Sequence, residues 1–241
     1  MAKNDNLKDL LTDVADAIRE KKGTTEKINP QDFSSEIKGI ESGSDFPADI
    51  VMVNDTEFGL NNGIKEISIK EGITVLSSYA FRYDRSIEKI ILPQSLTAIK
   101  EYAFSGMTKI NHIDLPENVD SLGTYVFNGS PFRSLIFPKK IGMIRYGTCV
   151  NCASLESVEI LYEGKSNISA TAFKGCTALR YISFPNHTAV CILDNTNGFD
   201  NTTCQFVVPD ALYDQWIVAT NWATYADRIV KASEFIEPTN D

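Results

Sequence analysis

The residues able to support catalysis or metal binding are few and scattered. The two histidines, His112 and His187, lie in no HExxH or comparable ligand spacing, which argues against zinc chemistry. No GxSxG, Walker loop or GxGxxG after a strand is present. Carboxylates are numerous, so a glycosidase pair stays open in principle, but nothing selects one. We therefore expect no enzymatic activity and no cofactor or metal.

Five cysteines offer a second possible chemistry, and Cys149 and Cys152 form a CxxC pair. Such a pair can hold a metal or act in redox exchange. However, Cys152 and Cys176 occupy the small apolar position that Met107 holds earlier in the chain. An odd number of cysteines also indicates free thiols. We therefore predict that the cysteines belong to the core, where a free thiol packs as a small hydrophobe.

A repeat of 23 residues must position whatever surface the chain presents, and two independent series of residues define it. The position of the aromatic that ends the YAF triplet recurs every 23 residues, with Phe81, Phe104, Phe127, Val150 (in place of an aromatic) and Phe173. A proline recurs with spacings of 23, 22, 23, 24 and 24 residues, and its series is Pro93, Pro116, Pro138, Leu161 (in place of proline), Pro185 and Pro209.

The unit from Ile87 to Lys109 is the best-formed repeat. Its first part alternates apolar with other residues, as in a short half-buried strand, and Pro93 ends the ladder. A second short apolar run leads to Phe104, and a turn at Gly106 closes the unit. One unit cannot bury both runs alone, so neighbouring units must stack.

The pattern L-x-x-I-x-L-P-x-S-L-x-x-I-x-x-x-A-F-x-x-C resembles the BspA-like leucine-rich repeat of bacterial surface and phage-encoded proteins. Ile87 to Met107 follows it nearly throughout, and Leu155 to Cys176 and Leu179 to Pro185 follow it in part. The resemblance implies an α+β fold, a leucine-rich-repeat solenoid of short β-strands over residues 64–209. We expect about six repeats of about 23 residues, an N-terminal helical hairpin and a C-terminal helical cap.

Residues 1–43 are predicted to form the hairpin, and residues 44–63 a linker and the N-terminal edge of the solenoid. The apolar faces of the two helices need each other, another subunit or a larger assembly. Because a linker follows the hairpin, we interpret it as a docking module; the alternative is a cap on the first repeat. The candidate docking residues are Leu7, Leu11, Val14, Ile18, Phe33 and Ile37. Leu10 to Ile40 is similar to the N-terminal segment of phage tail and other virion-associated proteins, which implies binding to other virion proteins.

The periodicity changes after Pro209, and residues 210–241 are predicted to cap the repeats. A helix is expected from Asp210, a second turn with Trp222 and Tyr225, and a short strand over Ile229 to Ala232. The unit before this cap is longer and more polar in its second half. We interpret that insertion as erosion of the repeat; the alternative is a functional loop.

The outward residues of the first strand in each repeat form the candidate binding face. Side chains four and two positions before the proline should point away from the core and align into columns when the repeats stack. The residues of these columns that we select as candidate contacts are Lys89, Ile91, His112, Asp114, Ile136, Glu159 and Tyr181. Exposed isoleucines on such a face favour a ligand, although scattered apolar surface residues are common.

A net charge of −9 without a basic cluster argues against nucleic-acid binding. The first residues lack a secretory signal, and no apolar run reaches the ~20 residues that span a bilayer. We therefore predict a non-enzymatic phage virion protein of the tail, fibre or head, assembled in the host cytoplasm. Its solenoid would present a surface that binds a host glycan, a host protein or another virion protein. Homo-oligomers are possible. The alternatives are a BspA-like adhesion protein on the bacterial cell surface and a purely architectural decoration protein.

Overall fold

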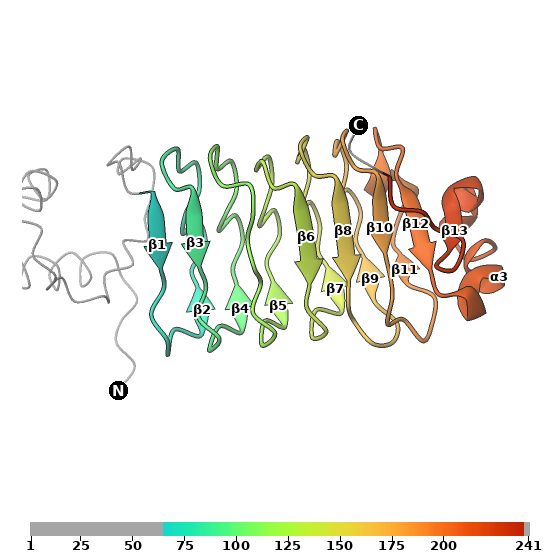
Figure 1. The fold of residues 1–241 in the computed structure, drawn as a ribbon, viewed down its shortest axis with the longest axis horizontal. Coiled ribbons are helices and arrows are strands. Elements are labelled where there is room, and N and C mark those ends of the chain that lie inside the picture. The colour runs from blue at the N-terminus through green and yellow to red at the C-terminus, as the bar shows by residue number, and fades with distance from the viewer. Residues whose placement is uncertain (1–64, 239–241) are drawn as a thin grey trace, which may run out of the picture. The chain divides into compact units, whose positions relative to one another are not determined.

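The computed structural model describes residues 65–238 (Figure 1). These residues belong to the second of two units into which the chain divides, Met1–Pro47 and Ala48–Asp241. The predictions for residues 1–43, including the docking residues, and for residues 44–63 lie outside the described part of the chain. The choice between a docking module and a cap therefore stays open.

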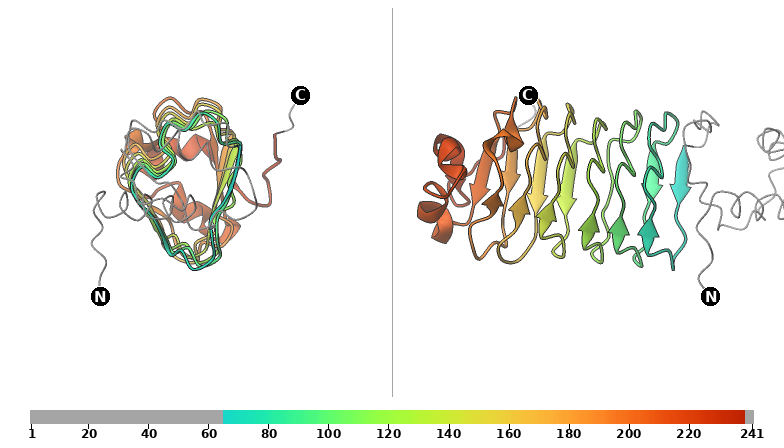
Figure 2. Two further views of the ribbon diagram at one scale, coloured as in Figure 1. Left: turned by 90° about the vertical axis from the view of Figure 1, so that its left-hand side faces the viewer. Right: turned by 180° about the vertical axis from the view of Figure 1, so that it is seen from behind.

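Short parallel strands stack in sequence order along one axis (Figure 1). The first strands of the repeats, with the closing strand β13, are β1 (Glu66–Ser68), β3 (Lys89–Ile91), β6 (Ser134–Phe137), β8 (Ser157–Ile160), β10 (Tyr181–Ser183), β12 (Gln205–Val208) and β13 (Ile229–Lys231). The second strands are β2 (Val75–Leu76), β4 (Ala98–Ile99), β5 (Ser121–Leu122), β7 (Met143–Ile144), β9 (Asn167–Ile168) and β11 (Ile192–Leu193). Viewed along the axis, successive repeats superimpose as one closed outline (Figure 2).

The first strands form two parallel sheets, β1-β3 and β6-β8-β10-β12-β13, and the second strands form β2-β4-β5 and β7-β9-β11. Each pairing joins residues one repeat apart; for example, Glu66 pairs with Lys89 and Leu76 with Ile99. The fold is therefore a leucine-rich-repeat type with short parallel strands and few helices. Its strands begin and end where the apolar alternation and the following proline indicate.

Inward side chains from both sets of strands fill one continuous core. Phe104 is completely buried and lies between Phe81 and Phe127, with ring centroids 5.5 and 5.9 Å away and nearly parallel planes. Phe173 and Phe199 stack in the same way at 5.7 Å. The aromatic position of the repeat is therefore a ladder that joins neighbouring units.

The prediction that Val150 holds this aromatic position is wrong. Cys149 occupies it: the thiol is fully buried, whereas Val150 is partly exposed. The main-chain N–H of Cys149 donates to the Ala172 carbonyl, as the N–H of Phe81 donates to Ala103 in an earlier repeat. The physical reason is a repeat shortened by one residue, which the 22-residue interval in the proline series also reflects.

The C-terminal segment closes the stack with short helical turns. These are η3 (Asp210–Leu212), α3 (Tyr213–Trp216) and η4 (Trp222–Arg228), and β13 then pairs with β12. Trp216 and Trp222 are fully buried, and the indole N–H of Trp222 donates to the Cys191 carbonyl at 2.7 Å. The eroded repeat keeps its core aromatic, because Phe199 ends the short helix η2 (Thr196–Phe199).

Candidate binding face

The predicted outward columns exist wherever the first strands pair. One column aligns Ser134, Ser157, Tyr181 and Gln205, and the next aligns Ile136, Glu159, Ser183 and Val207. In the other sheet, Lys89 lies beside Glu66, and Ile91 beside Ser68. Alternation along each strand thus places one set of side chains in the core and the other on a common face.

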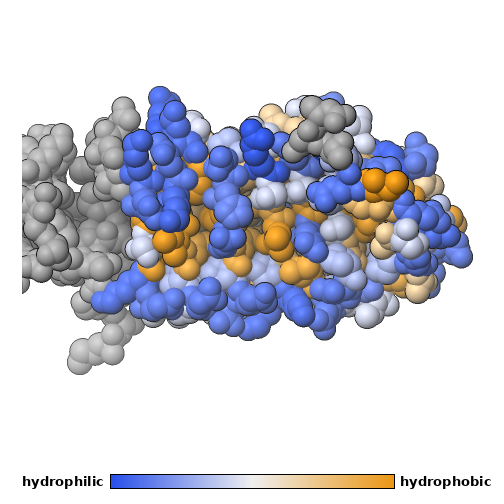
Figure 3. All heavy atoms as spheres, viewed as in Figure 1, coloured by the Kyte–Doolittle hydropathy of each residue, from blue (hydrophilic) through white to orange (hydrophobic). Residues whose placement is uncertain are grey.

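Apolar side chains stand out on this face. Ile91 is 44% exposed and Ile136 is 52% exposed, whereas their strand neighbours Ile90 and Leu135 are buried. Figure 3 shows apolar patches between hydrophilic side chains on the side of the stack that Figure 1 presents. Lys89 forms an ion pair with Glu66, and Glu159 is half-buried on β8. The face is mixed in charge, so it suits a partner that brings both apolar and polar groups.

The face is interrupted between β3 and β6. Residues 112–115 follow the repeat pattern but form no strand, and within the described residues 65–238 their main-chain groups make no main-chain hydrogen bond. The interruption coincides with the shortened repeat: Met107 and Ile110 are three residues apart, but the equivalent Ser130 and Phe132 are two apart. The shorter turn leaves the main-chain groups of these residues without main-chain partners, so a ligand that reaches them can form the missing hydrogen bonds.

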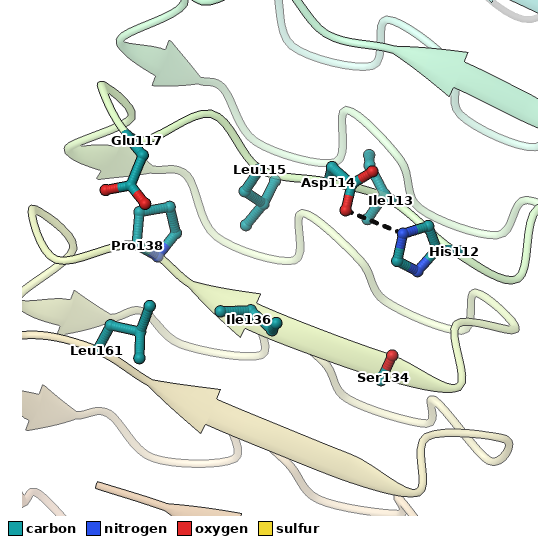
Figure 4. Close-up of a pocket in the computed structure, with 9 residues that line it drawn as sticks. All are labelled: His112, Ile113, Asp114, Leu115, Glu117, Ser134, Ile136, Pro138 and Leu161. Atoms are coloured by element: carbon teal, nitrogen blue, oxygen red, sulfur yellow. Dashed lines mark hydrogen bonds and ion pairs between the residues drawn. The ribbon is translucent and has the colours of Figure 1, made fainter. Parts of the chain in front are cut away.

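A hollow of about 140 Å³ lies at this interruption (Figure 4). Its apolar surface comes mainly from Leu115, Ile136, Pro138 and Leu161; Figure 4 shows Leu115 opposite Ile136, with Leu161 on the segment beyond Ile136. The other lining residues are His112, Ile113, Asp114, Glu117 and Ser134. Nε2 of His112 lies 2.9 Å from Oδ1 of Asp114, so the imidazole and the carboxylate hold each other in place. The hollow can accept an apolar side chain or ring edge and offers hydrogen-bonding groups beside it.

The structure therefore brings three of the predicted contact residues, His112, Asp114 and Ile136, into one site. Lys89 and Ile91 lie on the neighbouring strand β3. Sequence reasoning missed the role of Leu161, because the residue was read only as a substitute for proline. Its side chain completes the wall that Pro138 provides from the preceding repeat.

Tyr181 lies elsewhere, under the C-terminal segment of the same chain. Its ring is 4.9 Å from the ring of Phe235, and its hydroxyl donates to Glu237 at 2.8 Å. Burial and the Glu237 carboxylate raise the pKa of Tyr181. Val207, expected to point outward, is 7% exposed. At this end of the face, Tyr181 is already engaged by residues of its own chain.

A row of tyrosines is a second surface feature that sequence reasoning did not single out. Tyr79, Tyr102 and Tyr125 stack with centroid distances of 5.3 and 5.0 Å, and Tyr146 meets Tyr125 edge-on at 5.5 Å. The signal was present in the sequence, because each of the first three stands two residues before the core aromatic of its repeat.

The other groups with possible chemistry are in the core. All five cysteines are buried free thiols, which confirms the core interpretation of the CxxC pair. His187 is buried, its Nε2 is 2.6 Å from the Ser166 hydroxyl, and burial lowers its pKa to about 4. Over residues 65–238, no group of three or more His, Cys, Asp or Glu side chains is arranged to hold a metal, and no helix there has the length and apolar character to cross a membrane.

Comparison with known families identifies the repeat. The profile of the "BspA type Leucine rich repeat region (6 copies)" matches residues 26–156 and 142–205. The chain belongs to this family. No curated protein sequence gives a significant match.

The chain is similar to solved structures, of which the first described here supports the fold. A leucine-rich repeat protein from Eubacterium ventriosum is 19% identical, with a TM-score of 0.51 over 58% of this chain and 43% of that one. A leucine-rich repeat protein from Bacteroides ovatus is 24% identical, with a TM-score of 0.49 over 61% of this chain and 44% of that one. The chain thus spans less than half the length of these two proteins. These findings give no support to the predicted virion role or to a phage-type N-terminal segment.

Proposed function

We propose that the chain is a non-enzymatic adhesion protein of the BspA-like type, acting at a bacterial surface. Its repeats form a continuous solenoid that holds one binding face rigid. Membership of the family supports this proposal, because the resemblance links the repeat to bacterial surface proteins. No enzymatic family is indicated by the comparisons, and typical leucine-rich-repeat proteins bind rather than catalyse.

The hollow between β3 and β6 is the observation that carries the proposal. It is lined by exposed Ile136, by the polar pair His112–Asp114 and by residues 112–115, whose main-chain groups have no main-chain partner within residues 65–238. Exposed Ile91 lies outside the hollow, on strand β3 of the same face. Binding sites of proteins combine buried apolar contacts at the centre with polar groups at the rim. A host-surface or matrix protein that inserts an apolar side chain here and bonds to the exposed peptide groups is the partner that this surface favours.

Saturable binding of the labelled full chain to host cells and to immobilised matrix proteins tests the proposal. Replacing Ile91 and Ile136 together by serine should weaken binding about tenfold or more, since central apolar contacts dominate interface energies. The matched control replaces Val75 and Met143 by serine, because these side chains are each 44% exposed but lie on the second strands. Absence of saturable binding, or equal losses in both double variants, would contradict an adhesive face at this position.

A further inference from the structure

The tyrosine row carries a cation, Arg82. The guanidinium carbon of Arg82 lies 5.2, 4.5 and 5.1 Å from the ring centroids of Tyr79, Tyr83 and Tyr102. One of its nitrogens donates to the Tyr83 hydroxyl at 2.9 Å, and its buried Nε has no hydrogen-bond partner. In the described part of the chain no carboxylate forms an ion pair with Arg82. A guanidinium held between aromatic rings with donors to spare is suited to binding an anion.

The tyrosines themselves are held in an unfavourable backbone conformation. Tyr79, Tyr102 and Tyr125 have φ values of 66°, 56° and 57°, in the left-handed region where a bulky residue costs roughly 1–2 kcal/mol. The equivalent position is Gly147 in the next repeat and Thr171 in the one after. The repeat therefore does not require tyrosine there. Strain of this kind at a surface, kept in three successive units, points to a function for the side chains.

Space and exposure allow a ligand along the row. Tyr79 and Tyr146, at the two ends of the row, are 38% and 45% exposed, and Tyr83 beside Arg82 is 52% exposed. The ring of Tyr83 lies over Gly106, where an added Cβ would be only 2.3 Å from it. Gly129, one repeat further on, has open space above it. No side chain therefore covers the surface at Gly129, which lies one repeat beyond the glycine that Tyr83 covers.

We propose that this tyrosine row with Arg82 is a binding site for a saccharide that carries a carboxylate, such as a uronic or sialic acid. The inference rests on the proposed adhesive function and names a ligand class for a second surface. The carboxylate is bound by the Arg82 guanidinium, and the apolar face of the sugar ring packs on Tyr83. The steps of 5.3 and 5.0 Å between rings are close to the length of one pyranose unit, so successive sugars meet successive tyrosines.

Charge favours a single carboxylate over a polyanion. The chain carries a net charge of −9, which repels nucleic acids and densely sulfated polymers, whereas one acidic sugar meets the local cation. Aromatic rings with hydroxyl edges suit sugar rings better than the flexible side chains of an acidic peptide, which gain no ring stacking. An acidic peptide is therefore the competing outcome in the test.

Calorimetric titration of the full chain tests the site with sialyllactose, a hyaluronan oligosaccharide, neutral lactose and a peptide of alternating Asp and Glu. We expect one or both acidic saccharides to bind at least about tenfold more tightly than lactose and the peptide, because charge-assisted hydrogen bonds contribute ~1.5–3 kcal/mol. The saccharide that binds separates the sialic from the uronic source. Binding of neither, or equal binding of lactose or the peptide, overturns the proposal.

Variants locate the site. Arg82→Gln should weaken acidic-saccharide binding about 10–100-fold, and Tyr83→Ala about tenfold. Arg133→Gln is the matched control, because Arg133 is a surface arginine already paired with Glu156, and it should bind like the wild type. Arg82→Lys keeps the charge and serves as a second probe if Arg82→Gln does not fold. Equal affinity of the Arg82 and Arg133 variants overturns the assignment. If the wild-type chain binds no acidic saccharide but still adheres to cells, this inference alone is refuted and the proposed function stands.

Discussion

Removal of one ring from the aromatic ladder should cost far more stability than removal of an exposed residue from the same repeat. Phe104 is completely buried between two stacked rings, at 5.5 and 5.9 Å. Phe104→Ala removes this ring, and we expect the free energy of unfolding to fall by ~3–5 kcal/mol. Each lost ring–ring contact contributes ~0.5–1.5 kcal/mol of that fall. Ile91→Ala is the matched control. Its side chain is 44% exposed, so its loss should stay below about 1 kcal/mol.

Urea unfolding followed by circular dichroism measures both losses. Because each repeat contacts only its neighbours, a defect at Phe104 should also broaden the transition by uncoupling the units on either side. The free energy of unfolding of a natural domain is only ~5–15 kcal/mol, so the alanine variant can be unfolded. In that case Phe104→Leu is the milder substitution to measure. Similar losses for Phe104→Ala and Ile91→Ala would refute the reasoning that the ladder holds the repeats together.

Three further outcomes follow from local geometry. Gly147→Ala should destabilise the chain by ~1–3 kcal/mol more than Gly129→Ala in thermal unfolding. Both glycines have a φ of +64°, but only at Gly147 would the new Cβ clash with a ring, that of Tyr125 at 2.5 Å. The folded pKa of His187, about 4, lies below its usual 6.5, so the unfolded chain binds the proton more readily. Stability should therefore fall as pH decreases from about 6.5 towards 4; His187→Asn should remove that part of the fall, and an unchanged pH profile would contradict it. None of the five thiols should react with a disulfide reagent in the folded chain, because all are buried, and rapid labelling without denaturant would show otherwise.

The repeat could be predicted from sequence because it depends on burial and on proline. Apolar residues such as Ile87 and Ile90 must face the core, and Pro93 cannot continue a ladder, so spacing alone located the strands. The error at Val150 arose because one residue is missing from that repeat, and both Cys149 and Val150 are plausible core residues by composition. The main-chain pairing of Cys149 with Ala172 and the complete burial of Cys149 distinguish them in the structure.

The candidate site could be predicted only in part. Alternation identified His112, Asp114 and Ile136 as outward residues of the first strands. It could not show that the strand is missing at residues 112–115, because that depends on how a turn shortened by one residue aligns neighbouring repeats. It also could not show that Phe235 and Glu237 cover Tyr181, since contacts with a distant segment leave no periodic signal. The regular spacing of the tyrosines is present in the sequence, but the spacing does not show that the Arg82 guanidinium packs against their rings.

Amide hydrogen exchange measures the central claim most directly. In the free full chain, the amides of residues 112–115 should exchange quickly, because no main-chain group of residues 65–238 bonds to them, while those of β6 and β8 exchange slowly. Adding a partner found in the adhesion experiment should slow exchange at residues 112–115 and leave the second strands, such as β7, unchanged. Protection confined to the second strands, with residues 112–115 still exchanging quickly in the complex, would contradict the assignment of the binding face.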